Sequence, residues 1–169
     1  TNVGQLIIGH TASHPVQTHG FKVQVSGTNY QTSSVAQQRF QDGEFGATLA
    51  LAHSRNATQG NHTILQVNDE YGKIRFFGSD GNDFDGYGAE IVAKVESGIS
   101  NNSTPGRLEF HTTNSGTSAS TEKLRITSDG KVAIGTTIVG HGSADDLTID
   151  TSGGNTGITL RSGTVSYTH

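Results

Sequence analysis

The fold is indicated first by Leu124-Arg-Ile-Thr-Ser-Asp-Gly-Lys-Val-Ala-Ile134, in which two short alternating runs flank one turn signal. Successive side chains of a strand point to opposite faces of a sheet, so each run offers one apolar face. The dipeptide Asp129-Gly130 lies between the runs, and Asp-Gly in this setting is a strong signal for a hairpin. The stretch therefore predicts two antiparallel strands joined by a tight turn.

Runs of the same kind recur along the chain, and turn signals fall between them at Asp42-Gly43, Asp80-Gly81 and Pro105-Gly106. Short strands at this spacing predict an all-β fold of antiparallel strands and hairpins. A turn or two of helix at 33–40 is the less favoured interpretation, because β-branched residues lower helix propensity there. The predicted strands are Phe21–Val25, Thr48–Leu51, Ile64–Val67, Lys73–Phe76, Ala89–Val95, Arg107–Phe110, Leu124–Ile126, Val132–Ile134, Leu147–Ile149 and Ile158–Leu160.

The composition indicates that one copy of the chain has a thin core. Only 31% of the 169 residues are hydrophobic, 23 are glycine, and charged residues make up 15%. A typical globular chain is about 45–50% apolar when glycine is included. The low charged fraction argues against disorder, which usually comes with high charge. We therefore expect further copies to supply the missing burial, because association stabilises what a small core cannot.

Several classes of function are disfavoured by the same composition. The net charge of −4 and the lack of any Lys/Arg cluster argue against nucleic-acid binding. The absence of cysteine excludes disulfides and thiolate metal sites. The longest apolar run, Leu6–Ile8, is far shorter than the ~20 residues of a membrane-spanning helix, so no membrane insertion is expected. Without an initiator Met or a signal peptide, the chain is interpreted as a piece of a longer protein.

A weak internal repeat divides the chain. Val3–Gly9 resembles 130–136 in its apolar run that ends on glycine, and the strands that follow each run also correspond. Tandem units that cannot each bury a full core are typical of arrays. This predicts the end of one unit with a linker at 1–20, a complete β-rich module at 21–136, and a linker with the start of another unit at 137–169.

No motif in the sequence nominates a catalytic, cofactor or metal site, and we expect the chain not to be an enzyme. Its eight histidines form no His-x-His pair and no His-x-x-Glu-His or similar grouping, although a trimer axis could gather three copies of one of them. The run Asp80–Gly86 resembles a calcium loop but lacks the EF-hand register, so a solvated, Asx-rich turn is favoured. The carboxylate pairs Asp69-Glu70 and Asp145-Asp146 are interpreted as turn acids. The histidines are His10, His14, His19, His53, His62, His111, His141 and His169.

A resemblance to a known family rests on motifs that occur in a fixed order. They are Gly46-Ala-Thr-Leu-Ala-Leu-Ala-His-Ser-Arg-Asn56, Val67-Asn-Asp-Glu-Tyr-Gly-Lys-Ile-Arg-Phe76, Gly78-Ser-Asp-Gly81, Gly88-Ala-Glu-Ile-Val-Ala-Lys-Val95, Pro105-Gly-Arg-Leu-Glu-Phe-His-Thr-Thr113, Thr121-Glu-Lys-Leu-Arg-Ile126 and Asp129-Gly-Lys-Val-Ala-Ile-Gly-Thr136. The series resembles the repeat, or shaft, region of tail fibre proteins of tailed bacteriophages, including cyanophages. The resemblance covers a little over half of the chain and carries over no catalytic residue.

This resemblance implies an extracellular, virion-borne homotrimer that forms a shaft, contacts other virion tail proteins, and positions host-receptor binding. An alternative is a receptor-recognition module that binds host surface polysaccharide through the polar loops 28–42, 54–62 and 97–104. Tyr30, Tyr87 or Tyr167 could stack on sugar rings in such a module. A bacterial surface adhesin has a similar composition and is the third alternative. The sequence assigns no receptor-contact residue.

Overall fold

The all-β prediction is confirmed by the computed structural model, which describes residues 6–10, 12, 15–17, 20–139 and 146–150. Those residues form no helix, so the weak helical interpretation of 33–40 is wrong. In the same residues there is accordingly no helix with the length and hydropathy to span a bilayer. The strands are β1 (Leu6–Ile8), β2 (Val23–Val25), β3 (Glu70–Phe77), β4 (Tyr87–Val95), β5 (Gly106–Thr113), β6 (Ser120–Ile126), β7 (Val132–Ile134) and β8 (Leu147–Ile149).

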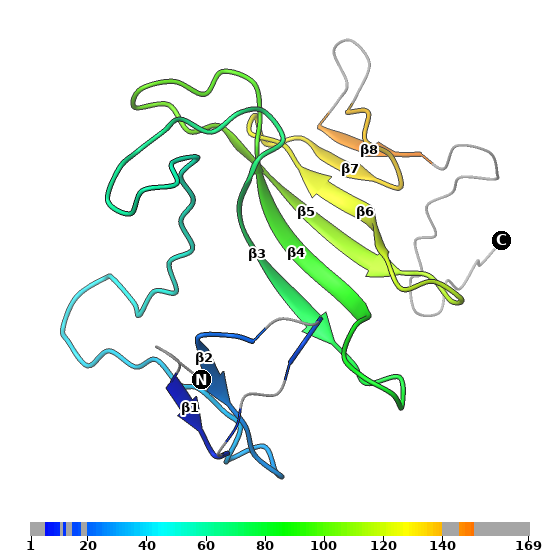
Figure 1. Ribbon diagram of the computed structural model, residues 1–169. Helices are drawn as coiled ribbons and strands as arrows, with labels where there is room; N and C mark the ends of the chain where they lie inside the picture. The colour runs from blue at the N-terminus through cyan, green and yellow to red at the C-terminus, as the bar shows by residue number, and fades with distance from the viewer. Residues whose placement is uncertain (1–5, 11, 13–14, 18–19, 140–145, 151–169) are drawn as a thin grey trace, which may run out of the picture.

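The main body is a six-stranded sheet in the order β3-β4-β5-β6-β7-β8 (Figure 1). Strands β3 to β7 pair antiparallel with their sequence neighbours, whereas β8 pairs parallel with β7. The hairpin predicted around Asp129-Gly130 joins β6 to β7, with Leu124 opposite Ile134 and Ile126 opposite Val132. Gly130 adopts a φ of 84° and donates a backbone hydrogen bond to Thr127 O at 3.0 Å, which explains why glycine is needed at this turn.

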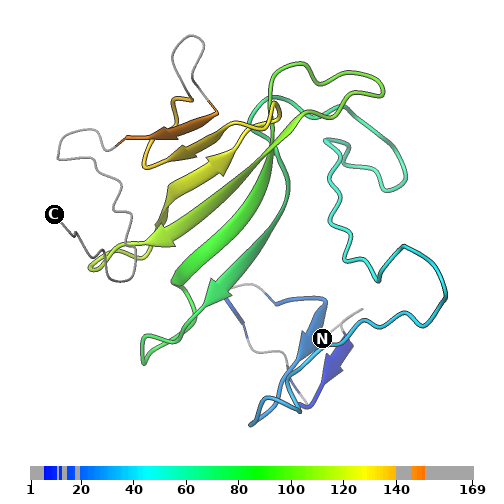
Figure 2. The same ribbon diagram turned by 180° about the vertical axis from the view of Figure 1, so that it is seen from behind.

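A second, two-stranded sheet consists of β1 and β2, which pair parallel. It lies beside the β3 end of the large sheet, as both views show (Figures 1 and 2). Gln17 links the two sheets: its backbone N–H donates to Phe84 O at 3.2 Å, and its side-chain oxygen accepts from Arg75 at 3.1 Å.

Some predicted elements are corrected by the structure. The runs Thr48–Leu51 and Ile64–Val67 form no strand, because neither pairs with another described segment of the same chain. Pro105-Gly106 is not a turn, since Gly106 begins β5 and the chain reverses earlier, around 97–102. The predicted strand at Ile158–Leu160 lies outside the described residues. A long segment at 26–69 therefore connects β2 to β3 without any strand of its own.

The large sheet separates its side chains sharply by face. Residues directly opposite each other on paired strands share one side of the sheet. The pairs Ile74–Ile91, Ala93–Leu108 and Phe110–Leu124 therefore lie on one side, which we call the apolar face. The pairs Arg75–Glu90, Lys94–Arg107 and Glu109–Arg125 lie on the other, which we call the charged face.

Candidate interaction surfaces

The apolar face is the more exposed of the two sides of the sheet. Phe76 and Ile74 of β3 are 53% and 45% exposed, and large apolar side chains stay accessible across the sheet as far as β8. A contiguous apolar patch of this kind on a polar chain marks an interaction surface. The exposed members are Ile74, Phe76, Leu108, Ile126, Ile134 and Leu147.

The charged face, in contrast, contains several of the most buried side chains of the large sheet. Glu109 on β5 is 1% exposed, as is its cross-strand neighbour Val92 on β4. Buried carboxylates are tolerated only when they are paired and hydrogen-bonded. Glu109 meets this condition fully: Arg107 Nε lies 2.6 Å from Oε1, and Lys94 Nζ and His111 Nε2 each lie 2.8 Å from Oε2.

Two further ion pairs extend this network across the strands. Arg75 Nε donates to Glu90 Oε2 at 2.9 Å, and the Arg75 guanidinium lies 4.4 Å from the centre of the Tyr87 ring. On β6, Arg125 binds both oxygens of Glu122 at 2.6 Å. Each acid on this face is thus matched by at least one cation from its own or a neighbouring strand. Because the charges satisfy one another, this face needs no partner to cover it.

The electrostatics of Glu109 follow from competing effects. Burial removes water from the carboxylate and alone would raise its pKa. The hydrogen bonds from Lys94, Arg107 and His111 outweigh that penalty and hold the pKa of Glu109 at about 2. At neutral pH the group is therefore ionised, and it orders these side chains of β4 and β5 around itself.

Glu109, His111 and Glu122 also form the one grouping with metal-ligand potential in the described residues, with ligand atoms within 4.8 Å of one another. The sequence alone does not predict this grouping, because Glu122 of β6 comes close to Glu109 and His111 of β5 only through the pairing of the two strands. Their oxygens are already engaged by arginine and lysine, and a cation would have to enter beside those charges. The cluster therefore serves as an ion-pair network. Of the other histidines, His10, His53 and His62 lie elsewhere, and His14, His19, His141 and His169 lie outside the described residues.

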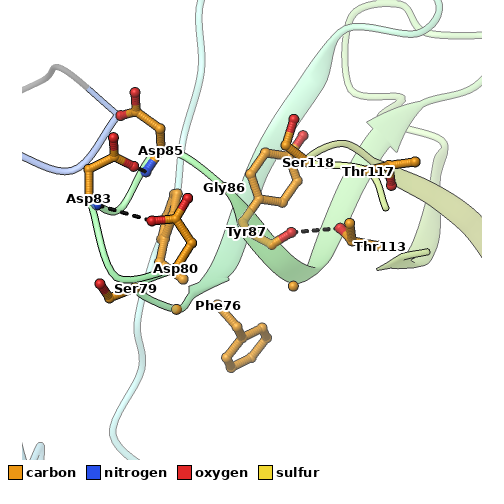
Figure 3. A pocket seen from close by; sticks show the side chains of 13 residues that line it. Phe76, Ser79, Asp80, Asp83, Asp85, Gly86, Tyr87, Thr113, Thr117 and Ser118 are labelled. Carbon is orange, nitrogen blue, oxygen red and sulfur yellow. Dashed lines mark hydrogen bonds between the residues drawn. The ribbon is translucent and has the colours of Figure 1, made fainter. Parts of the chain in front are cut away.

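The Asp80–Gly86 run forms a turn between β3 and β4, beside a cavity of about 670 Å³ (Figure 3). Asp80 Oδ1 accepts backbone hydrogen bonds from Asn82 and Asp83, at 2.9 and 3.2 Å, and Asp83 Oδ1 accepts one from Asp85 at 2.9 Å. The backbone hydrogen bonds lower the pKa of Asp80. These carboxylates cap their own loop, which is the Asx-rich turn that the sequence favoured over a calcium loop.

The tyrosines proposed for sugar stacking differ in their surroundings. Tyr87 lines the cavity, but Arg75 covers one face of its ring and Phe77 packs edge-on with centroids 5.8 Å apart. Tyr30, in the loop 28–42, is 76% exposed and offers an open ring. Tyr167 lies outside the described residues. The loops 54–62 and 97–104 lie largely at the surface.

Comparison with known proteins adds no family: no protein-family model matches the chain, and no curated protein matches it. The charged network is what sequence reasoning missed. Its signal was present as the alternations Glu90-x-Val92-x-Lys94 and Arg107-x-Glu109-x-His111, in which charged residues occupy one face of two strands. Alone, these alternations predict the strands but not which strands pair.

Proposed function

We propose that the chain is a structural, non-enzymatic module of a homotrimeric fibre, of the kind that the phage tail fibre resemblance implies. The observation that carries the proposal is the solvent exposure of the sheet's two faces. The charged side chains around Glu109 are largely buried, whereas large side chains of the apolar face are exposed. Few residues of this chain are apolar, and those on an exposed face stabilise the protein only when association removes them from water.

The properties of the apolar face favour other copies of the chain as its cover. Every residue paired with Ile74, Leu108 or Ile134 on a neighbouring strand is apolar, so like faces can meet without strong repulsion. With strands about 4.8 Å apart and about 3.3 Å per residue, six strands of three to nine residues each offer roughly 600 Å². A stable interface needs about 800 Å² per partner, and the exposed segment 26–69 can add the rest. Three such faces around an axis make a closed shaft.

The location on a virion, with other tail proteins as neighbours, belongs to the same proposal and rests on the ordered sequence motifs. Polar turns and the charged network would face solvent there, and the chain would space or orient receptor-binding elements. Loss of a host polysaccharide on incubation with the protein would contradict the non-enzymatic part of the proposal.

The test is the oligomeric state of the purified chain by light scattering. We expect a trimer for the natural sequence and a monomer for the double variant Phe76→Ser/Ile134→Ser, which removes two apolar anchors from the face. The matched control is Phe84→Ser, which removes an exposed aromatic from the β3–β4 turn instead. A folded monomer for the natural sequence would overturn the trimer. A trimer that the control alone dissociates would overturn the role of the apolar face in holding it together.

Receptor recognition is the second candidate, and the open ring of Tyr30 favours it. Exposed aromatic rings in polar loops are suited to stacking on sugars. A glycan array probed with the natural chain and with Tyr30→Ala separates the two candidates. Binding that the substitution abolishes supports carbohydrate recognition, by a phage fibre or by a bacterial adhesin. No binding to any glycan leaves the shaft as the better proposal.

A further inference from the structure

The segment before β3 carries an unusual display of apolar side chains. We define the arm as residues 35–51, which contain no strand in the structure. Phe40 is 90% exposed, and the other large apolar side chains of the arm are between 49% and 73% exposed. They are Val35, Phe45, Leu49 and Leu51.

The tip of the arm has a defined conformation. Arg39 donates through Nε to Gln41 Oε1 at 3.1 Å and through Nη1 to Phe45 O at 2.6 Å. These bonds close the chain over residues 39–45 and place Phe40 and Phe45 on the outside. Ordered aromatic residues that project into water are suited to a preformed contact, because little conformational entropy is lost when they bind.

The base of the arm is attached to the edge of its own sheet. The Leu51 side chain packs so closely on Gly72 of β3 that a Cβ added to Gly72 would lie 2.6 Å from the Leu51 Cβ. Two residues further on, His53 Nδ1 lies 2.7 Å from Glu70 O. From this attachment the rest of the arm runs beyond the β3 edge and away from the sheet in both views (Figures 1 and 2).

We propose that the arm crosses to a neighbouring copy of the chain and covers the part of its apolar face around Ile134 and Leu147. This inference rests on the proposed trimer and names a contact between copies that would stabilise it. In a ring of identical copies each interface joins two different surfaces, so the β3 side of one copy meets the β8 side of the next. The arm leaves from the first of these sides, and Ile134 and Leu147 lie at the second.

The chemistry of the two surfaces agrees with this contact. Both offer exposed aliphatic or aromatic side chains, and the residues paired with Leu147 and Ile134 across β7 and β8 are apolar. The run Thr48–Leu51 alternates as a strand but pairs with no described strand of its own chain. A partner strand on a second copy would complete it by β-augmentation. This explains why a strand predicted from the sequence is not formed within one chain.

The test uses the natural chain with the photoreactive amino acid p-benzoylphenylalanine in place of Phe45. Unlabelled carrier chains of this kind are co-refolded with ¹⁵N-labelled natural chains, irradiated, and digested for mass spectrometry. We expect crosslinks from unlabelled position 45 to labelled peptides that contain Ile134 or Leu147. The matched control places the photoreactive residue at Phe84, an exposed aromatic of the β3–β4 turn, and should not crosslink to those peptides.

The outcomes separate this inference from the trimer on which it rests. A trimer whose crosslinks stay within one chain, or reach other surfaces of the neighbour, overturns the crossing arm and leaves the trimer standing. A monomer by light scattering overturns both. The substitution Phe40→Ser/Phe45→Ser gives a second measurement, since it should speed exchange of labelled for unlabelled subunits at least tenfold. An unchanged exchange rate contradicts this stabilising role.

Discussion

The two parallel strand pairs, β1–β2 and β7–β8, are built alike. Leu6 and Ile8 face Val23 and Val25 in the first pair, as Val132 and Ile134 face Leu147 and Ile149 in the second. The backbone bonds also correspond: Leu6 N to Lys22 O at 2.7 Å matches Val132 N to Asp146 O at 2.9 Å, and Ser26 N to Ile8 O at 2.8 Å matches Asp150 N to Ile134 O at 3.0 Å. Gly9 and Gly135 follow the first strand of each pair, with φ of 86° and 75°.

The two pairs differ at the other edge of their first strand. Strand β7 also pairs with β6, and its central residue Ala133 is fully buried. Strand β1 pairs only with β2 among the described residues, and its central residue Ile7 is half-buried. The local sequence therefore suffices to form the parallel pair, whereas its burial depends on an antiparallel sheet beside it. If β1 is the counterpart of β7, its open edge is suited to a strand like β6. The boundaries at 20 and 136 remain predictions.

The largest expected effect comes from a substitution that destabilises the antiparallel sheet beside β7–β8 and leaves β1–β2 unchanged. Glu109→Ala leaves the buried Arg107 and the half-buried Lys94 without their carboxylate, and loss of one partner of a buried pair costs about 3–5 kcal/mol. We expect the free energy of unfolding to fall by that amount in urea denaturation, and hydrogen exchange at Ala133 to accelerate accordingly. Exchange at Ser26, in the β1–β2 pair, should change little.

The exposed acid Glu44 provides a control for this prediction, since Glu44→Ala removes the same charge from the arm. Equal destabilisation by both variants would mean that net charge, and not the buried network, determines stability. Equal acceleration of exchange at Ala133 and Ser26 in Glu109→Ala would mean that the two pairs share one cooperative unit.

Low pH provides a second way to weaken the stabilisation that Glu109 gives to the large sheet. The pKa of Glu109 is about 2 in the folded chain, below its ordinary value of 4.5. Because the folded pKa is depressed, the stabilisation is complete above pH 4.5 and is lost as the pH falls towards 2. The loss is on the order of 3 kcal/mol. Urea denaturation at successive pH values should show this dependence, and it should flatten in Glu109→Gln. An undiminished slope in that variant would assign the pH dependence to other acids.

The sequence predicted most of the strands in the large sheet and missed how their faces are used. Alternation placed Lys73–Phe76, Ala89–Val95 and Arg107–Phe110 correctly, because period-two patterning reflects the strand itself. The failures at Thr48–Leu51 and Ile64–Val67 have one physical cause: a strand needs a partner, and pattern alone does not supply it. The alternations in β4 and β5 indicate that charged side chains share one face of each strand. The contacts around Glu109 depend in addition on the register that unites β4, β5 and β6, which is a property of pairing.

Substitution of the glycines that follow β1 and β7, Gly9 and Gly135, should have a smaller effect and also compares the two strand pairs. A left-handed φ costs about 1–2 kcal/mol for residues with a side chain. Gly135→Ala should therefore lower the free energy of unfolding of the large sheet by about that amount. In Gly9→Ala the new Cβ would also lie 1.9 Å from Ser26 O, so the β1–β2 pair should open. We expect loss of exchange protection at Ser26 with little change in the urea midpoint. A fall in the midpoint as large as for Gly135→Ala would show that β1–β2 belongs to the main cooperative unit.

The smallest expected effect comes from Gln17, whose side chain joins the two-stranded sheet to the β3–β4 region of the large sheet. Gln17 accepts a hydrogen bond from Arg75 at 3.1 Å and donates one from Nε2 to Asp85 O at 3.2 Å. Both bonds lie near the surface, so Gln17→Ala should reduce the free energy of unfolding by only about 0.5–1 kcal/mol. Arg75 keeps Glu90 and the Tyr87 ring as partners, so the large sheet should retain its exchange protection. The amides of β1 and β2 should exchange faster, because the pair loses side-chain contacts to its neighbour while its own ladder remains. Unchanged exchange in β1–β2 would mean that the parallel pair holds itself together, and that its resemblance to β7–β8 extends to stability as well as geometry.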